Sequence, residues 1–338
     1  MTRRSWLPAL ALSALLVAGL LATGQPARSA GSQVYIALGD SIAAGIGSSL
    51  PRERGYPAIV RELLARQTGK DVALESLAVP GETARSFRDG GQFARYRDLV
   101  NRLSRGGAPI AAVSLSLGGN EMLRVSGSDT GDRQAALDDF QLAYPAALAD
   151  VRAAVGPDVP IVVTNYYDLS SGDPAIVESA AWWVARFNEV IASGAAASNA
   201  QVADVATAFA GRIDELTLNP SDVHPTNAGH RAIAGAVWKA LALDTIAPTI
   251  GVAATLDASR LTPTLRFAVH DDTGVDSVRI ESGGATVSGP YRTDDGEYVA
   301  LLDLRGSVGS VTVTIHAADA AGNVSSSVVT VNAPGRTP

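Results

Sequence analysis

The chain has 338 residues, which is long for a single hydrophobic core, so we expect two domains. Its formal net charge is −7 and it has no long basic run, which argues against nucleic acid as a partner because phosphate binding needs clustered Lys and Arg. The sequence contains no cysteine, which excludes disulfides, thiolate metal ligands, a cysteine nucleophile and lipidation at cysteine.

Residues 1–30 have the layout of a secretory signal peptide. Two basic residues, Arg3 and Arg4, precede an apolar stretch from about residue 6 to 22, and small residues follow. We therefore expect cleavage within 24–31 and a secreted or extracytoplasmic protein. The arginine pair also resembles a twin-arginine export motif over a short match. The alternative is a single membrane anchor, since the apolar run approaches the length of a short transmembrane helix.

Residues 31–244 alternate short apolar strands with helical patterns. Candidate strands lie at 34–38, 72–78, 109–117, 160–167 and 200–206, and helical patterns at 56–69, 92–107, 132–156, 174–198 and 226–243. Strands separated by helices predict βαβ crossovers, and therefore an α/β fold with a mainly parallel sheet and helices on both faces. The pattern at 132–156 contains Pro145, so this helix is either kinked or split there. Ligands of such folds bind at the carboxyl ends of the strands.

Residues 245–338 have a different pattern. From about residue 250 the helical period is lost, and apolar positions such as Leu265, Phe267 and Val269 alternate with other residues. This period predicts half-buried antiparallel strands and a small β-sandwich domain. The stretch "HAADAAGN" resembles the late-strand turn of bacterial immunoglobulin-like domains, and such a domain makes a cell wall or a glycan a candidate partner. Its acidic turns are candidate calcium ligands or, more simply, solvated turns.

Ser41 follows the first strand directly, in the sequence Gly39-Asp40-Ser41. The glycine permits a tight turn, and the residues after Ser41 can open a helix whose N–H groups favour a developing negative charge. A serine at its ordinary pKa is a weak nucleophile and needs a base. On its own the motif is common, so a structural turn serine is the alternative. We expect Asp40 to stabilise the turn rather than take part in chemistry.

The candidate base is one of four histidines. His270 and His316 fall on the polar face of alternating strands, where we expect them to face solvent. His230 falls on the first turn of the last helical pattern, which suggests a surface or capping residue. His224 lies in the loop before that helix, and Asp222 stands two residues earlier. A histidine beside a carboxylate at the strand ends is what acid–base catalysis requires.

Two glycine-rich turns follow the second and third strands. Gly81 lies in "VPGET" and Asn120 in "GGNE". Each turn alone is an ordinary connection between a strand and a helix. Acyl transfer, however, needs hydrogen-bond donors that face an oxyanion, and the Gly81 N–H, the Asn120 amide and the Ser41 N–H would supply three. Together with His224, these features point to acyl transfer.

In this order the blocks resemble the SGNH or GDSL hydrolase family. Its four blocks appear here as "GDS" with Ser41, "VPGET" with Gly81, "GGNE" with Asn120 and "DVHP" with His224. The resemblance covers about residues 34–243. It implies a three-layer α/β/α fold of the flavodoxin-like type and ester hydrolysis through an acyl-serine. It also implies that Ser41 attacks, that His224 takes and returns the proton, and that Ser41, Gly81 and Asn120 form the oxyanion hole.

Two positions depart from the family pattern. The third block usually ends in Asp and here has Glu121. The acid of the family's catalytic triad normally stands three residues before the histidine, a position that Ser221 occupies, whereas Asp222 stands two before. Either the loop bends so that Asp222 orients the imidazole, or a backbone carbonyl near Ser221 does so and leaves a Ser–His dyad.

The sequence therefore predicts a secreted, monomeric serine esterase or lipase that uses no metal and no other cofactor. Its substrate is a small ester, of a lipid or an acylated carbohydrate. The alternatives are a carbohydrate acetylesterase of the same fold and a catalytically weak wall- or glycan-binding protein. We expect segments 48–55 and 124–134 to line or cap the cleft, the second as a mobile lid. Trp182 and Trp183 are adjacent on a helix and cannot both face the core, so we expect one to be exposed.

Overall fold

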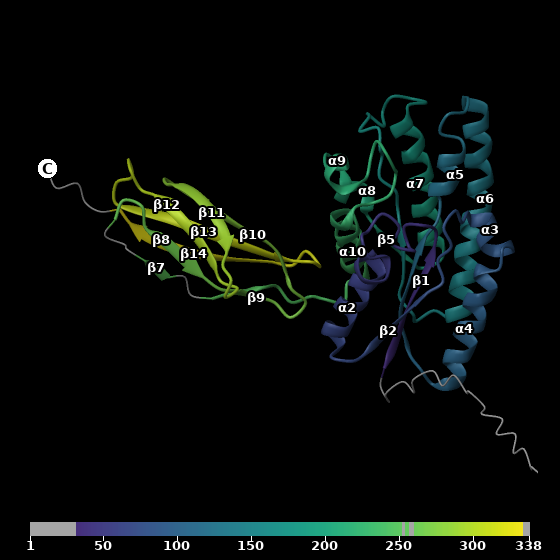
Figure 1. The fold of residues 1–338 in the computed structure, drawn as a ribbon, viewed down its shortest axis with the longest axis horizontal. Coiled ribbons are helices and arrows are strands. Elements are labelled where there is room, and N and C mark those ends of the chain that lie inside the picture. The colour runs from purple at the N-terminus through teal and green to yellow at the C-terminus, as the bar shows by residue number, and fades with distance from the viewer. Residues whose placement is uncertain (1–31, 252–253, 257–259, 334–338) are drawn as a thin grey trace, which may run out of the picture. The chain divides into compact units, whose positions relative to one another are not determined.

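The computed structural model describes residues 32–251, 254–256 and 260–333 (Figure 1). The predicted signal peptide and its cleavage site lie outside the described residues, and the predicted domain boundaries stay predictions. Within the described ranges, no helix combines the length and the apolar character that crossing a membrane would require.

A five-stranded parallel sheet carries the candidate functional residues. Its strands are β1 (Gln33–Gly39), β2 (Val72–Ser76), β3 (Ile110–Ser116), β4 (Ile161–Thr164) and β5 (Gln201–Ala203), in the order β2-β1-β3-β4-β5. Every neighbouring pair in this sheet is parallel. The chain starts in β1, adds β2 on one side and then adds β3, β4 and β5 on the other. The carboxyl ends of β1 and β3 therefore flank the switch point at which open α/β sheets bind ligands.

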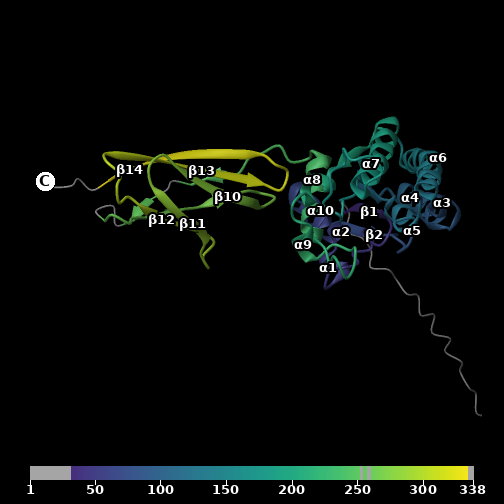
Figure 2. The same ribbon diagram turned by 90° about the horizontal axis from the view of Figure 1, so that it is seen from above.

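Helices cover both faces of this sheet (Figures 1 and 2). They are α1 (Pro51–Arg54), α2 (Tyr56–Thr68), α3 (Ala84–Asp89), α4 (Gln92–Gly106), α5 (Gly119–Arg124), α6 (Thr130–Val155), α7 (Ala180–Ala197), α8 (Val205–Phe209), α9 (Ile213–Leu216) and α10 (Asn227–Leu241). Side chains of α3, α4, α6 and α7 share one core with Ile36 and Leu38, while those of α2, α8, α9 and α10 share the other with Tyr35. Because successive strand residues point to opposite faces and both faces are covered, β1 is apolar from Val34 to Leu38. The predicted three-layer α/β/α fold is confirmed.

Helix boundaries resolve two points that the sequence left open. Helix α6 continues through Pro145 as one helix. Helix α7 starts at Ala180, so the prediction of a helix from residue 174 is wrong over its first residues, because the Ser179 side chain caps the helix by accepting a hydrogen bond from the Trp182 N–H. Trp183 is buried, and the half-buried Trp182 packs against it edge-on with ring centroids 4.8 Å apart. Neither tryptophan is exposed, which corrects the expectation for the pair.

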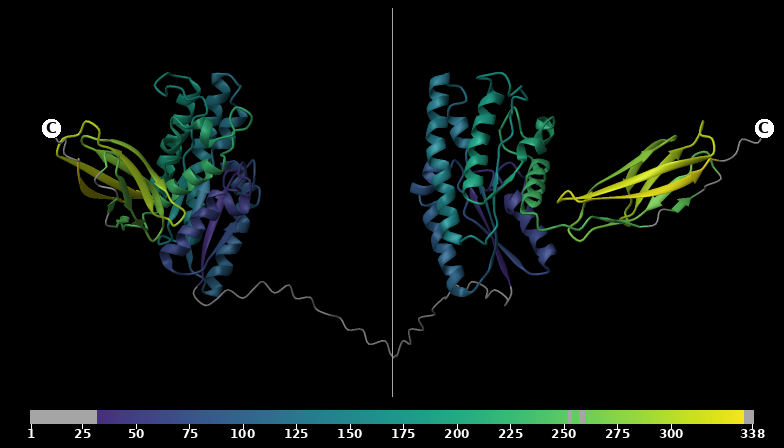
Figure 3. Two further views of the ribbon diagram at one scale, coloured as in Figure 1. Left: turned by 60° about the vertical axis from the view of Figure 1, so that its left-hand side comes forward. Right: turned by 180° about the vertical axis from the view of Figure 1, so that it is seen from behind.

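The C-terminal residues form antiparallel sheets, which confirms the predicted all-β region (Figure 3). Their strands are β6 (Thr249–Ile250), β7 (Ala254–Leu256), β8 (Thr264–Phe267), β9 (Val269–His270), β10 (Val275–Ser282), β11 (Thr286–Arg292), β12 (Tyr298–Asp303), β13 (Ser310–Asp319) and β14 (Val324–Asn332). The sheets have the orders β10-β13-β14, β11-β12-β8-β7 and β6-β9. Leu265, Phe267, Val313 and Ile315 lie in their shared core, as the alternating pattern predicts.

Candidate active site

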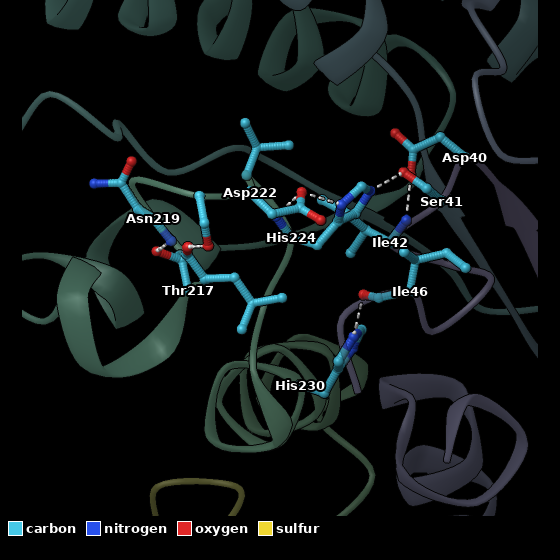
Figure 4. Close-up of polar contacts among 12 residues, drawn as sticks. Asp40, Ser41, Ile42, Ile46, Thr217, Asn219, Asp222, His224 and His230 are labelled. Carbon is cyan, nitrogen blue, oxygen red and sulfur yellow. Dashed lines mark hydrogen bonds and ion pairs between the residues drawn. The ribbon is translucent and has the colours of Figure 1, made fainter. Parts of the chain in front are cut away.

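Ser41, His224 and Asp222 form a continuous chain of hydrogen bonds (Figure 4). The Nε2 atom of His224 lies 2.8 Å from Ser41 Oγ, and its Nδ1 atom lies 2.6 Å from Asp222 Oδ1. Of the two alternatives for orienting the imidazole, the structure has the Asp222 carboxylate. The side chains come from the turn after β1 and from the loop before α10, which lie far apart in sequence and meet at the carboxyl ends of the strands.

The loop before α10 bends so that an acid two residues before the histidine can reach the ring. The N–H groups of Ser221 and Asp222 donate to the Leu218 carbonyl at 3.0 and 3.1 Å, and the Leu218 N–H donates to the His224 carbonyl at 3.0 Å. The Asp222 carboxylate also accepts the His224 N–H at 3.2 Å. These bonds fold the loop back on itself, so Asp222 lies beside the imidazole while the Ser221 hydroxyl donates to Leu218.

The Asp222 carboxylate is held in its charged form although it lies at the surface. Desolvation raises its pKa, but hydrogen bonds from the His224 ring and from backbone N–H groups outweigh this effect and leave the pKa of Asp222 below its ordinary value. A charged carboxylate on Nδ1 fixes the tautomer whose Nε2 faces Ser41 and can accept a proton from it.

The turn after β1 needs glycine at position 39. Gly39 has a φ of +118°, and a Cβ atom there would lie 2.0 Å from the Ser116 carbonyl oxygen of the paired strand β3. No other residue fits this close approach. After the turn, Ser41 enters a series of turns over 41–47 instead of an α-helix, so the expectation of a helix opening at Ser41 is wrong. Gly45 and Gly47 have φ values of +82° and +94°, which interrupt a right-handed helix.

Asp40 is buried beneath the turn and supports it, in the manner that the sequence suggests. Its carboxylate accepts hydrogen bonds from the Tyr166 hydroxyl at 2.6 Å, from Ser116 Oγ at 3.1 Å and from the Ile42 N–H at 3.0 Å. Burial raises the pKa of Asp40 even though these bonds oppose the shift. The side chain joins the turn to β3 and to the segment after β4.

His230 is a buried structural residue, which corrects the expectation of a surface or capping role. It lies in the first turn of α10 as predicted, but its side chain is fully buried. Its Nε2 atom lies 2.9 Å from the Ile46 carbonyl oxygen (Figure 4), and its Nδ1 atom accepts the Tyr56 N–H at 3.3 Å. The ring is neutral in this arrangement, and burial lowers the pKa of His230. It holds the turn that follows Ser41 against α10.

The other two histidines take no part in this site. His270 is largely exposed, as expected. His316 is half-buried rather than fully solvent-facing, and its Nδ1 atom lies 2.9 Å from Ser326 Oγ.

The loops that carry Gly81 and Asn120 are tied to each other. The Asn120 amide donates to the Glu82 carbonyl at 2.8 Å, and Glu121 Oε1 accepts the Ala84 N–H at 2.7 Å. The amide has a second N–H, which leaves one donor for a ligand. Gly81 has a φ of +84°, and the Asn120 side chain, but not Gly81, lines the cleft at Ser41. Glu121, the residue that departs from the family pattern, is therefore a clamp between the two loops.

Two buried polar side chains that the sequence analysis missed connect this loop to the nucleophile turn. Gln92 is fully buried, and its Oε1 atom accepts the Gly39 N–H at 2.7 Å. Its Nε2 atom donates to the Gly39 carbonyl at 2.9 Å and to Glu82 Oε2 at 2.7 Å. The available sequence signal was a glutamine and a glutamate placed where the strand ends meet, since buried polar side chains of this kind are rare unless they are hydrogen-bonded.

A cleft of about 400 Å³ opens at Ser41. Val125, Ser126 and Arg133 line it, so the predicted segment 124–134 contributes to the cleft, whereas no residue of the predicted segment 48–55 does. Segment 48–55 instead contains α1 and a contact in which the Ser49 N–H donates to Asn227 Oδ1 at 2.9 Å. That segment 124–134 moves as a lid stays a prediction.

Comparison with known proteins finds a family whose model matches the α/β part of the chain. Residues 37–232, more than half of the chain, match the model of the GDSL-like lipase/acylhydrolase family. A search of curated proteins finds no similar sequence.

Comparison with solved structures finds matches at low sequence identity. A lipase from a goat rumen metagenome is 21% identical with a TM-score of 0.51, and the match covers 63% of this chain and 99% of that one. An acetylxylan esterase from Geobacillus stearothermophilus is 22% identical with a TM-score of 0.47, over 63% of this chain and 96% of that one. The lipase match indicates the same fold; neither match carries the substrate of the other protein to this chain.

Proposed function

Because this chain belongs to the GDSL-like lipase/acylhydrolase family, we propose that it is a serine ester hydrolase in which Ser41 forms an acyl-enzyme. The observation that carries this proposal is the chain of short hydrogen bonds from Ser41 through His224 to Asp222. A serine needs an adjacent base to act as a nucleophile, and an imidazole held by a carboxylate is such a base.

In the proposed acylation step, His224 Nε2 takes the proton of Ser41 as Oγ attacks the ester carbonyl carbon. Asp222 keeps the imidazole in position and stabilises the positive charge that it acquires. The carbonyl oxygen becomes negatively charged and is held by the Ser41 N–H and the Asn120 amide. The family resemblance also assigns the Gly81 N–H to the oxyanion hole, but Gly81 does not line the cleft in this structure. The tetrahedral intermediate then collapses, the bond to the alcohol oxygen breaks, and His224 returns the proton to the leaving alcohol.

Deacylation repeats these steps with water as the nucleophile. His224 takes a proton from water, hydroxide attacks the acyl carbon, and the bond to Ser41 Oγ breaks. The protonated imidazole then gives its proton to Oγ. The enzyme returns to its starting state with the acid and the alcohol released, and no cofactor enters the reaction.

Turnover of p-nitrophenyl acetate by wild type, Ser41→Ala and His224→Ala tests this proposal. We expect both variants to lose at least about 1,000-fold in kcat, since triad residues act as a unit. Ser126→Ala is the matched control, because Ser126 also lines the cleft but lies outside the hydrogen-bonded chain, and it should retain wild-type turnover. Ser41→Ala with wild-type turnover would refute a catalytic role for Ser41.

We also propose that the protein is exported, with its substrate an ester of a lipid or an acylated carbohydrate. The basic, apolar and small-residue layout of residues 1–30 supports export. Expression of the full chain and of a chain lacking 1–30, followed by assay of the cell and medium fractions, tests this. Export of the truncated chain at the same level would contradict the proposal. Contact of the C-terminal sheets with a wall or glycan rests on the sequence resemblance alone.

A further inference from the structure

The cleft at Ser41 has a polar end and an apolar body. Ser41, His224 and Asn120 lie at the polar end. The walls beyond them are formed by α5, which contributes Met122 and Leu123, and by α7, which contributes Val184 and Phe187 among others. The lining also includes polar residues, namely Ser126, Arg133, Tyr166, Tyr167, Asp168 and Ser170. The four hydroxyl groups among them each donate to a partner within the chain, and the Asp168 carboxylate accepts from Ser170 and Gly172. With these groups already bonded, the apolar walls of α5 and α7 suit an aliphatic ligand.

The Arg133 guanidinium does not make the cleft a polar-ligand site. Its Nε atom donates to the Val125 carbonyl at 3.3 Å and its Nη2 atom to the Ser126 carbonyl at 2.6 Å. These bonds use two of its five N–H donors and tie the side chain to the loop between α5 and α6. Arg133 fixes the loop that forms one rim of the cleft.

The position of the base decides which half of an ester the apolar walls accept. In the proposed reaction the leaving oxygen must face His224 Nε2, because that atom protonates it. The carbonyl oxygen must face the Asn120 amide, the second residue of α5. Met122 and Leu123 follow Asn120 on the same helix and line the cleft. The substituent of the carbonyl carbon would then extend along α5 and α7, which form the apolar walls.

We propose that this part of the cleft is an acyl-chain site, and that the enzyme prefers esters of straight aliphatic acids to acetyl esters. This inference rests on the proposed function, since the acyl group reaches the cleft through Ser41. In this proposal Val184 sets the length of chain accepted, because it is half-buried and lines the apolar body from α7. The bonds made and broken are those of the proposed reaction; the acyl-chain site adds only binding.

The size of the preference follows from the burial of methylene groups. A fully buried methylene group favours binding about fourfold, and in an open cleft about half of its surface is covered, which gives about twofold. Octanoyl carries about six more methylene groups than acetyl, so kcat/KM for octanoate should exceed that for acetate by about 50-fold.

The test measures kcat/KM for p-nitrophenyl acetate, butyrate and octanoate below their micelle-forming concentrations. Val184→Trp fills the apolar body and should lower the ratio of octanoate to acetate by at least about tenfold. Leu123→Asp places a charge on an exposed wall position that tolerates substitution, and should lower the same ratio without loss of folding. Ala192→Trp adds the same bulk on an exposed position of α7 away from the cleft, and should leave the ratio unchanged.

A second comparison separates the acyl side from the alcohol side. Ethyl octanoate and octyl acetate carry the same chain on opposite sides of the ester, and titration of released acid follows both. We expect wild type to favour ethyl octanoate, and Val184→Trp to reduce this preference. Faster hydrolysis of octyl acetate, reduced by Val184→Trp, would overturn the acyl assignment and place the chain on the alcohol side.

The outcomes distinguish this inference from the proposed function. If wild type hydrolyses none of these esters, the proposed function fails and the acyl-chain site fails with it. If acetate is hydrolysed in a Ser41-dependent manner but octanoate is no better, or if Val184→Trp leaves the ratio unchanged while circular dichroism shows a folded chain, only the acyl-chain site is overturned.

Discussion

The free energy of unfolding of Glu121→Gln, measured relative to wild type at the same pH, should increase as the pH rises from acidic to alkaline values. Glu121 clamps the Asn120 and Gly81 loops through the Ala84 N–H, but its second carboxylate oxygen, Oε2, is buried without a hydrogen-bond partner among the described residues. Burial raises the pKa of Glu121 to about 7, against the opposing effects of its hydrogen bonds and of Arg124. At pH values between 4.5 and about 7, Glu121 is therefore protonated in the folded chain and ionised in the unfolded chain.

The sign and the magnitude follow from proton linkage. Between pH 4.5, the ordinary pKa of a glutamate, and the folded pKa of about 7, the native state binds more protons than the unfolded state, so the free energy of unfolding falls as pH rises. The difference between the two pKa values corresponds to about 3 kcal/mol, fully present below pH 4.5 and lost above pH 7. Glutamine keeps an oxygen for the Ala84 N–H and does not ionise, which removes this pH dependence.

Urea unfolding of wild type and Glu121→Gln at pH 5 and pH 8 measures the effect. The stability of the variant relative to wild type should rise by roughly 2 to 3 kcal/mol from pH 5 to pH 8, since part of the change already occurs below pH 5. The comparison between two pH values cancels any fixed effect of the new amide. Glu53→Gln, an exposed substitution on α1, is the control and should show no such change. A difference that is the same at both pH values would refute the reasoning.

Three further predictions concern the residues that hold the candidate triad. Asp222→Asn should lower kcat on p-nitrophenyl acetate by at least about 100-fold, yet by less than His224→Ala, because the amide still contacts Nδ1 but no longer stabilises the imidazolium; wild-type kcat would contradict a role for the acid. Gly47→Ala should lower both kcat and the melting temperature, since a Cβ atom there would lie 2.3 Å from the Pro225 carbonyl oxygen. Gly69→Ala is the control for backbone strain, because φ at Gly69 is also positive but a Cβ atom there would meet nothing within 4 Å; this variant should keep wild-type kcat. Burial lowers the pKa of His230, so the neutral ring contributes stability that is lost as the pH falls below about 6.5, the ordinary pKa of histidine. The melting temperature should therefore fall less between pH 8 and pH 5 for His230→Gln than for wild type. Parallel curves of melting temperature against pH would contradict this prediction.

The sheet and the reacting residues could be predicted from the sequence because both rest on local patterns. The buried residues of strands such as β1 form continuous apolar runs, and the glycines before Ser41 and Asn120 mark the turns at the strand ends. What the pattern could not provide was the conformation of the loop before α10. The contact between Asp222 and His224 depends on hydrogen bonds to Leu218, which no periodicity in the sequence indicates.

The buried polar residues were the other part that local patterns could not predict. His230 occupies the expected first turn of α10, but its burial depends on Ile46 and Tyr56, residues from distant parts of the chain. Gln92 begins a helix and has no neighbour in sequence that marks it as buried. Long-range contacts decide whether such a side chain faces water or a partner, so a single sequence leaves the question open.

The Gln92 side chain has a consequence for how this site can change during laboratory evolution. One amide serves three polar partners, on Gly39 and on Glu82, and both of these residues are buried. A substitution of Gln92 that still bonds one of these groups leaves the others without a hydrogen-bond partner. The turn before Ser41 and the loop that carries Gly81 and Glu82 therefore cannot be altered independently. Variant libraries that alter either segment should therefore keep Gln92 and Glu82 fixed together or randomise both at once, since single-site libraries will recover the parent pair.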